Sequence, residues 1–148
     1  MTYSERLRPP LLWWIVFGLV AVTFVIAVAV FLSPGFVAAA LVVAVAVEIA
    51  VMHSFSAGLR VSEEGVRAGR ALLEWPYVGS VRTLTRDEVR LRFGRDADPR
   101  AYAVVRSFVD EAVEITVEDP ADPHPYWLVS TRDAAALAEA IEKARVVA

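Results

Sequence analysis

Two apolar runs of membrane-spanning length dominate the first third of the chain. Residues 11–32 and 36–55 are separated only by a Ser-Pro-Gly tripeptide at 33–35, and the stretch 11–57 contains one acid, Glu48, and no lysine or arginine. An α-helix rises about 1.5 Å per residue, so each run is long enough to cross a hydrocarbon core of about 30 Å. We therefore expect a transmembrane helical hairpin whose turn contains the tripeptide.

Arginines flank both predicted spans. Arg6 and Arg8 precede the first span, Arg60, Arg67 and Arg70 follow the second, and the turn between the spans has no charge. Positively charged residues stay preferentially on the cytoplasmic side of a membrane. The pattern predicts a multi-pass protein of the plasma membrane with both termini in the cytoplasm.

A cleaved signal peptide is the competing interpretation of the first run. Its apolar stretch exceeds the usual 7 to 15 residues, and a second run follows almost at once. We predict that it is retained as a helix, preceded by a short cytoplasmic segment over residues 1–10.

Glu48 is the only acid inside the predicted spans. An acid at this depth is by default a functional hypothesis, either a proton-linked group or a contact to a partner. The alternative, a protonated or water-reaching side chain facing the helix pair, is favoured because two spans provide no second buried acid or base. Small residues spaced by four, at Ala40 and Ala44 and at Ala46 and Ala50, would let the first helix or another protein approach closely, which includes self-association.

Residues 58–148 carry 13 basic and 16 acidic side chains and change to an alternating apolar pattern typical of half-buried strands. Gly65 is expected to turn a β-hairpin, and 101–109 and 112–118 to form two strands joined through the Asp-Glu pair at 110–111. The predicted strands are 59–62, 66–68, 71–75, 78–84, 101–109, 112–118 and 125–130.

Two helices are predicted in this part of the chain. Thr85 and Glu88 form a capping box for a short helix over 86–93. A closing amphipathic helix over 132–145 is expected to be capped by Ser130 or Thr131. The predicted fold is an α+β membrane protein, in which the hairpin precedes a small antiparallel β domain over 58–148 closed by a C-terminal helix, as in pleckstrin-homology-like domains. This analogy of architecture does not transfer lipid binding.

The composition argues against several classes of function. The net charge is −3 with both signs interspersed, so the chain lacks the basic field that nucleic-acid binding requires. The chain contains no cysteine, which removes disulfides and thiolate ligands and fits a domain facing the cytosol.

Candidate chemistry is sparse. Asp119, Asp122 and His124 are potential metal ligands, but they share a short proline-rich loop without the usual spacing or a fourth ligand, so a stiff turn is the favoured interpretation. His53 and Ser54 lack a nearby triad acid and are interpreted as residues of the membrane boundary. We predict no catalytic, cofactor or metal site. Glycines interpreted as turn and bulge residues, not as a phosphate loop, are Gly65, Gly69 and Gly79.

Aromatic and arginine side chains provide the best candidates for contact residues. Arg100, Arg106 and Tyr102, together with Tyr126 and Trp127, would line a binding face, and the alternative is that one face of each strand is simply core. Neighbours in a strand point to opposite sides, so one of Tyr126 and Trp127 is expected outside the core, beside the loop that contains Arg100.

Three stretches carry a resemblance to a known family. They are YSERL at 3–7, ADPRAY at 97–102 and DPADPHPYWLVST at 119–131. The chain resembles the actinobacterial membrane-protein family catalogued as domain of unknown function 3093. The resemblance implies a plasma-membrane protein of a high-GC actinobacterium and brings no activity or catalytic residue. His124 stands where the family usually has threonine, which argues against essential chemistry at this position.

Together these patterns favour a non-enzymatic, membrane-anchored interaction or assembly domain, whose partners are the lipid bilayer and a protein or a second copy. The alternative is a module that binds a small ligand or a lipid headgroup, which would need a concave pocket flanked by Arg60, Arg67 or Arg100. An enzyme is the third possibility and the hardest to support, because nucleophile, base and orienting group cannot be named together.

Overall fold

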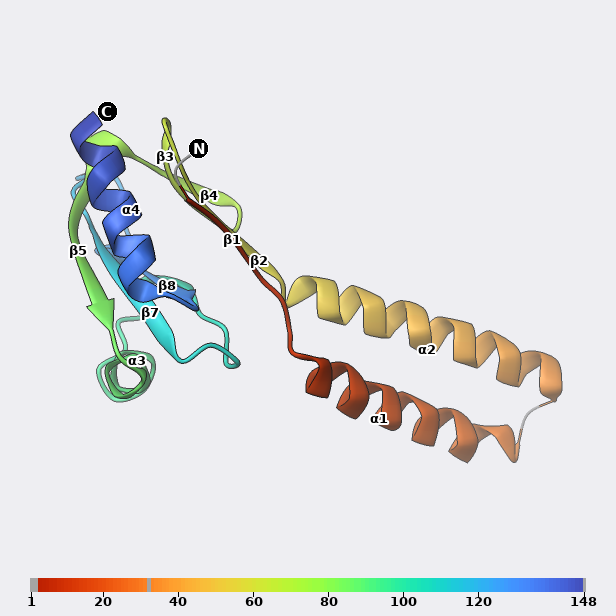
Figure 1. The fold of residues 1–148 in the computed structure, drawn as a ribbon. Coiled ribbons are helices and arrows are strands. Elements are labelled where there is room, and N and C mark those ends of the chain that lie inside the picture. Colours follow the sequence, from red (N-terminus) through yellow and green to blue (C-terminus); the bar gives the residue numbers. More distant parts are fainter. Residues whose placement is uncertain (1–2, 32, 148) are drawn as a thin grey trace. The chain divides into compact units, whose positions relative to one another are not determined.

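A computed structural model of the chain describes residues 3–31 and 33–147. The chain divides into two units, a helical unit over residues 8–56 and a β unit that joins the N-terminal segment ending at Leu7 to the residues from Ala57 onward. Figure 1 shows the helices and strands of both units.

The helical unit consists of two antiparallel helices, α1 (Leu11–Ala29) and α2 (Pro34–Ser54). Both are long and apolar enough to cross a membrane, most of their side chains are exposed, and each has one buried residue, Val25 and Met52. The predicted end of the first helix, Leu32, lies outside the described residues. The second helix begins at Pro34 instead of at Phe36, because a proline at the first helical position loses no hydrogen bond. The prediction that Pro34 and Gly35 form the turn was therefore wrong.

The first sheet of the β unit is an antiparallel meander. It contains β1 (Tyr3–Leu7), β2 (Ala57–Ser62), β3 (Gly65–Ala68) and β4 (Ala71–Glu74), in the order β1-β2-β3-β4. Gly65 turns the β2–β3 hairpin as predicted: its φ is 143°, and a Cβ there would lie 2.1 Å from the carbonyl oxygen of Leu73.

Strand β1 corrects the prediction that residues 1–10 form a separate segment. Leu7 pairs with Ala57 and Tyr3 pairs with Val61, so the N-terminal segment is an edge strand of the sheet. The Glu5 carboxylate fastens it further, accepting hydrogen bonds from the Thr131 hydroxyl at 2.6 Å and from the Arg132 amide at 3.1 Å. In sequence, the helical hairpin is therefore an insertion between two paired strands of one sheet.

The second sheet has the order β5-β7-β8-β6. Its strands are β5 (Val78–Leu84), β6 (Tyr102–Val104), β7 (Glu111–Val117) and β8 (Tyr126–Thr131), and a short 3-10 helix, η1 (Trp75–Tyr77), leads into it.

The predicted hairpin of 101–109 with 112–118 is wrong. Strand β6 has only three residues and pairs in parallel with β8, and β8 in turn separates it from β7. The chain leaves the sheet after Val104, where the Arg106 amide donates to the Ser130 hydroxyl at 3.0 Å and the Val109 amide donates to the Arg106 carbonyl.

Two helices cover the second sheet. Helix α4 (Ala134–Val147) contacts strands of both sheets, and α3 (Arg86–Phe93) packs against β5 and β7 (Figure 1). The main core therefore lies between the two sheets and α4, and a smaller cluster lies under α3. The main core includes Leu59, Val61, Val66, Val113, Ile115, Trp127, Val129, Leu137 and Ile141, and the smaller cluster contains Leu84, Val89, Ala112 and Leu128.

The caps of these helices differ in how well they were predicted. The capping box of Thr85 and Glu88 is confirmed, since the Thr85 amide donates to Glu88 Oε2 at 2.9 Å. The cap expected for the last helix was wrong: Ser130 and Thr131 are fully buried in β8, and the carboxylate of Asp133 accepts from the Ala136 amide at 2.8 Å instead.

Candidate functional site

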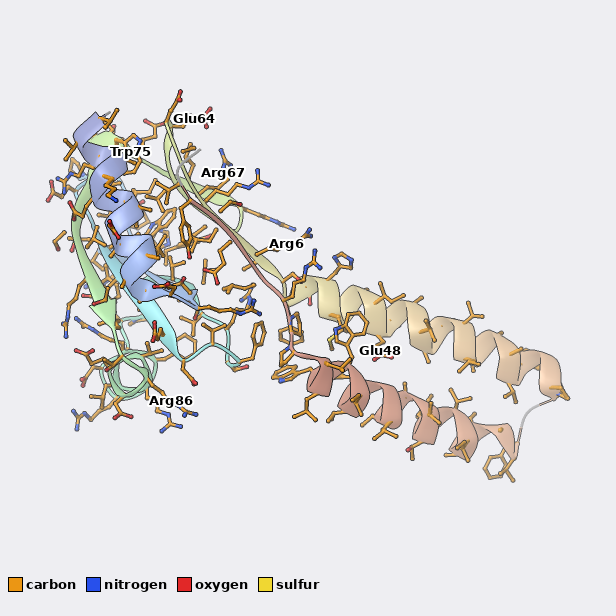
Figure 2. All side chains as sticks on the ribbon, viewed as in Figure 1. Arg6, Glu48, Glu64, Arg67, Trp75 and Arg86 are labelled. Atoms are coloured by element: carbon orange, nitrogen blue, oxygen red, sulfur yellow. The ribbon has the colours of Figure 1, made fainter. Side chains whose placement is uncertain are left out.

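The single acid of the helical unit, Glu48, lies in a groove between α1 and α2 of about 500 Å³. Its carboxylate faces Gly18, where a Cβ would be 3.5 Å from Oε1. The lining is otherwise apolar and includes Phe17 and Phe24 of α1 and Val47 of α2. Figure 2 labels Glu48 on α2. The structure therefore places this acid against the other helix of the pair. This position agrees with the interpretation of Glu48 as a side chain that faces the helix pair.

The alanine pairs of α2 lie on different faces. Ala40 and Ala44 line the groove with Glu48, one helical turn apart, whereas Ala46 and Ala50 are exposed. Only the first pair therefore meets the neighbouring helix, as small residues in a helix–helix contact do.

The proline-rich loop after β7 is a set of capped turns. Asp119 accepts from the Ala121 amide at 2.9 Å, and Asp122 Oδ1 accepts from the His124 amide at 2.8 Å and lies 2.6 Å from His124 Nδ1. The backbone hydrogen bond from His124, with help from its ring, lowers the pKa of Asp122 below its ordinary value. Within residues 3–31 and 33–147, no three histidine, aspartate or glutamate side chains gather as metal ligands do.

The predicted contact residues do not form one face. Trp127 is 3% exposed in the main core, while Tyr126 packs on the opposite side of the sheet against the cluster under α3, with the Arg92 guanidinium 5.5 Å from its ring centroid. The prediction that they point to opposite sides is confirmed. Tyr126 is outside the buried core, as expected of one of the pair, but it is half-buried and not exposed, because this side of the sheet is partly covered.

Tyr102 and Arg100, two further members of the predicted contact set, have different roles. The Tyr102 hydroxyl donates to the Ala68 carbonyl at 3.1 Å and so ties the second sheet to the first. Arg100 is bound by the carboxylate of Asp98, which its guanidinium and its amide contact at 2.9 to 3.2 Å. The side-chain hydrogen bonds from Arg100 lower the pKa of Asp98 below its ordinary value.

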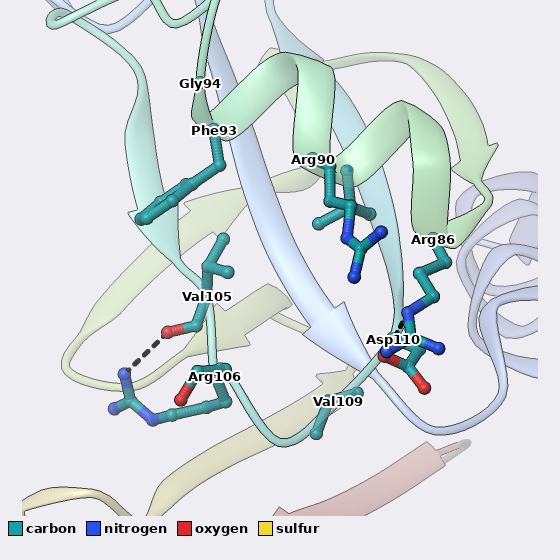
Figure 3. A pocket seen from close by; sticks show the side chains of 10 residues that line it. Arg86, Arg90, Phe93, Gly94, Val105, Arg106, Val109 and Asp110 are labelled. Carbon is teal, nitrogen blue, oxygen red and sulfur yellow. Dashed lines mark hydrogen bonds and ion pairs between the residues drawn. The ribbon is translucent and has the colours of Figure 1, made fainter.

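A hollow of about 300 Å³ lies between α3 and the segment 105–110. In Figure 3 the guanidinium of Arg90 extends toward this segment, and Arg86 reaches Asp110, with Nε 3.1 Å from Oδ1. Arg106 turns away and donates to its own neighbour, the Val105 carbonyl, at 3.1 Å. None of Arg60, Arg67 and Arg100 lines this hollow. It is therefore not the ligand pocket that was expected beside one of these arginines.

The outer face of the first sheet gathers arginines that were expected as flanks of the spans and, for Arg60 and Arg67, also as possible flanks of a ligand pocket. Alternation turns Leu59 and Val61 inward and Arg60 outward on β2, and it exposes Arg6 on β1 and Arg67 on β3. Arg60 and Arg67 are paired directly across the strands, and Ser4 is opposite Arg60. In Figure 2, Arg6 and Arg67 lie on the side of the sheet that faces away from α4.

These arginines differ from those of the rest of the β unit. Neither the Arg6 nor the Arg60 side chain has a hydrogen bond or ion pair with any other described residue, and the Arg67 side chain reaches only Glu64, at 3.7 Å. Elsewhere in the unit, five arginines form ion pairs, whereas Arg90 forms none with a described residue. The pairs are Arg82 with Glu88, Arg86 with Asp110, Arg92 with Glu114, Arg95 with Asp96 and Arg100 with Asp98. No local pattern reveals this face, because Arg6 joins it only through pairing with a strand some fifty residues away.

Comparison with known proteins identifies a family but no activity. Residues 2–141 match the sequence model of a family described as protein of unknown function (DUF3093). No curated protein and no solved structure matches the chain.

Proposed function

Since the chain belongs to the family described as protein of unknown function (DUF3093), we propose a role from its geometry, that of a non-enzymatic, membrane-anchored docking domain. In this proposal the α1–α2 hairpin spans the plasma membrane and both termini lie in the cytoplasm. The β unit, with a pleckstrin-homology-like arrangement of two sheets and a closing helix, then presents its surface to a partner at the inner leaflet.

The observation that carries the proposal is the pairing of Leu7 with Ala57. Strand β1 leads into α1 through three residues, and α2 returns to β2 after Phe55 and Ser56. Because these strands are hydrogen-bonded neighbours, the sheet is connected to the hairpin at two adjacent points. Such a double attachment restricts the β unit more than a single flexible linker would.

The exposed apolar side chains of the hairpin support insertion into a bilayer. The large residues of α1 and α2 that lie at the surface include Leu12, Phe24, Phe36 and Val42. The hydroxyls of α1 and α2 bond within their own helix, Thr23 to the Leu19 carbonyl at 2.8 Å and Ser54 to the Val51 carbonyl at 2.7 Å. A helix with satisfied hydroxyls and an apolar surface is stable in lipid, whereas in water this surface would promote aggregation.

The architecture supports the pleckstrin-homology-like assignment in its main features. A four-stranded meander is followed by a second sheet, and the C-terminal helix α4 contacts both sheets. Two features depart from a simple antiparallel order, the helix α3 and the parallel pairing of β6 with β8. The assignment concerns architecture and carries no ligand with it.

Extraction and topology test the anchoring. The full chain is expected to stay in membrane vesicles during a wash with alkaline carbonate, and a reporter fused after the last residue is expected to be active in the cytoplasm. Release of the intact chain by the wash, or a reporter active outside the cell, would overturn the proposal. Affinity purification in mild detergent then identifies protein partners of the anchored domain.

A second candidate function is the binding of a small anion in the hollow beside α3. It is favoured by Arg90, which lines this hollow and has no ion pair with any residue in the described part of the chain. Titration of the full chain in detergent with inorganic phosphate tests it. Arg90→Gln should abolish the heat of binding, and Arg95→Gln, at the end of the same helix region, should leave it unchanged.

A further inference from the structure

The outer face of the first sheet has a charge gradient along its strands. The β3–β4 turn, which contains Arg70, and the strand ends at Leu7 and Ala57 lie at one end of the sheet. Arg6 lies near this end, and Arg60 and Arg67 are paired in the middle. Glu63, Glu64 and Glu74 lie at the other end, around the β2–β3 turn, and the remaining acid of the sheet, Glu5, is bound by Thr131 and Arg132.

Nothing described in the chain neutralises the basic end. The guanidinium groups of Arg6, Arg60 and Arg70 form no hydrogen bond or ion pair with another residue among 3–31 and 33–147. Arg60 and Arg67 are directly opposite on neighbouring strands, and like charges at such positions destabilise a sheet. A set of guanidinium groups arranged this way is suited to several phosphate groups, because each guanidinium presents planar donors to them.

The chain limits how far this basic end can lie from the ends of the helices. Strand β1 ends at Leu7 and α1 begins at Leu11, so even a fully extended connection spans only about 14 Å. Strand β2 begins at Ala57, three residues after α2 ends at Ser54. This reach is comparable to the distance over which the surface potential of an anionic membrane acts, about 10 Å.

We propose that this arginine face, defined by Arg6, Arg60, Arg67 and Arg70, binds the phosphate headgroups of anionic lipids in the membrane that holds the hairpin. The inference rests on the proposed function, because it requires that the helices span a bilayer. The acids at the far end of the sheet would be repelled by the same surface, so the gradient also selects an orientation of the sheet on the membrane.

The absence of cysteine from the sequence allows a single label to report docking. Ser4→Cys places a fluorophore on the arginine face, and Thr83→Cys places one on the exposed surface of β5. Each labelled full chain is reconstituted into nanodiscs whose lipids carry a nitroxide quencher at the headgroup. The nanodiscs contain phosphatidylcholine alone or with phosphatidylglycerol.

Quenching at Ser4→Cys should increase when phosphatidylglycerol is present and should decrease again at high salt, while quenching at Thr83→Cys should not change. Each arginine near an anionic surface contributes roughly a fivefold preference, so the combined change Arg6→Gln, Arg60→Gln and Arg67→Gln should lower the docked-to-free ratio by about 100-fold. The matched control is Arg82→Gln, Arg86→Gln and Arg95→Gln, which removes the same charge elsewhere and should leave docking unchanged.

The failure of this inference is distinguishable from the failure of the proposed function. If carbonate releases the chain from vesicles, the anchoring itself is wrong. If the chain remains anchored but Ser4→Cys is quenched equally with and without phosphatidylglycerol, or if both triple variants behave alike, the lipid-binding face is wrong and the anchoring stands. Hydrogen exchange of β7 and β8 in each variant checks that the β unit is folded.

Discussion

The two sheets of the β unit use their arginines in opposite ways. In the second sheet and α3, Arg82, Arg86 and Arg92 each meet a carboxylate of the same unit. In the first sheet, Arg6 and Arg60 meet none within the described residues, although both sheets share one core. The difference teaches that charge stabilises the second sheet internally, whereas the first sheet keeps its charge available for an external anion and is held by packing and backbone geometry.

The largest expected effect is at the turn of the first sheet. Gly65→Ala adds a Cβ at a φ of 143° and 2.1 Å from the Leu73 carbonyl oxygen. We expect a loss of about 2–4 kcal/mol in the free energy of unfolding, measured from urea midpoints of the full chain in detergent micelles. Gly58→Ala is the control, because a Cβ there has no atom within 4 Å. Equal midpoints for the two variants would show that backbone geometry at this turn is unimportant.

The second effect tests the internal ion pairs of the other sheet. Arg92 lies with Nε 2.9 Å from Glu114 Oε2, and the Glu114 side chain is only 14% exposed. Arg92→Met keeps the aliphatic contact but leaves this carboxylate without its partner, so we expect a loss of about 1–2 kcal/mol in the same urea measurement.

Arg95→Met is the matched control for this substitution. Arg95 pairs only with its neighbour Asp96 and is 78% exposed, so its removal should change stability by less than about 0.5 kcal/mol. A similar loss in the free energy of unfolding for both variants would mean that the ion pair with Glu114 stabilises the chain no more than an exposed pair does. The proposed difference between the two sheets would then be wrong.

A smaller effect of opposite sign is expected on the arginine face. In detergent without anionic lipid, Arg60→Thr removes a like-charge pair with Arg67 and should stabilise the chain by about 0.2–1 kcal/mol. Arg82→Thr on β5 should instead destabilise it, because Arg82 is paired with Glu88. Destabilisation by both substitutions would contradict the idea that the first sheet holds uncompensated charge.

The smallest effect concerns pH. The hydrogen bond from the Thr85 amide, followed by the one from its hydroxyl, lowers the pKa of Glu88 below its ordinary value. The ionised carboxylate therefore stabilises the cap of α3 at neutral pH, and this contribution is lost as the pH falls through the lowered pKa. Glu88→Gln should show a weaker decrease in thermal midpoint between pH 7 and acidic pH than the natural chain. Parallel decreases would show that this group does not contribute.

Local elements were predictable to within a few residues. The strand over 78–84, the helix over 86–93 with its capping box and the hairpin at Gly65 match the structure, because alternation, capping residues and turn glycines act over a few neighbouring positions. Strand β1 was missed, since five residues with little alternation become a strand only by pairing with β2. Strand β6 was predicted to pair with β7, the next strand in the sequence. This was wrong for a similar reason, because its actual neighbour is β8, which comes later in the sequence and lies between β6 and β7.

The candidate sites divide in the same way. The capped turns at Asp119 and Asp122 followed from residue type and turn spacing, and the position of Glu48 against the helix pair followed from the lack of a second buried acid or base in the spans. The burial of Trp127 and the cover of Tyr126 by α3 did not follow, because parity gives the side of a strand to which a residue points but not what covers that side.

The order of residues alone establishes the apolar helix pair, the polar β unit that follows it and most of the individual strands, since each depends on interactions between near neighbours. Three-dimensional pairing alone brings Arg6 beside the strand of Arg60 and opposes Arg60 to Arg67, so the arginine face exists only after the chain has closed a sheet across its own helical hairpin. The physical reason is that strand register is set by long-range hydrogen bonding and by burial of a shared core, neither of which is written in any short stretch of residues.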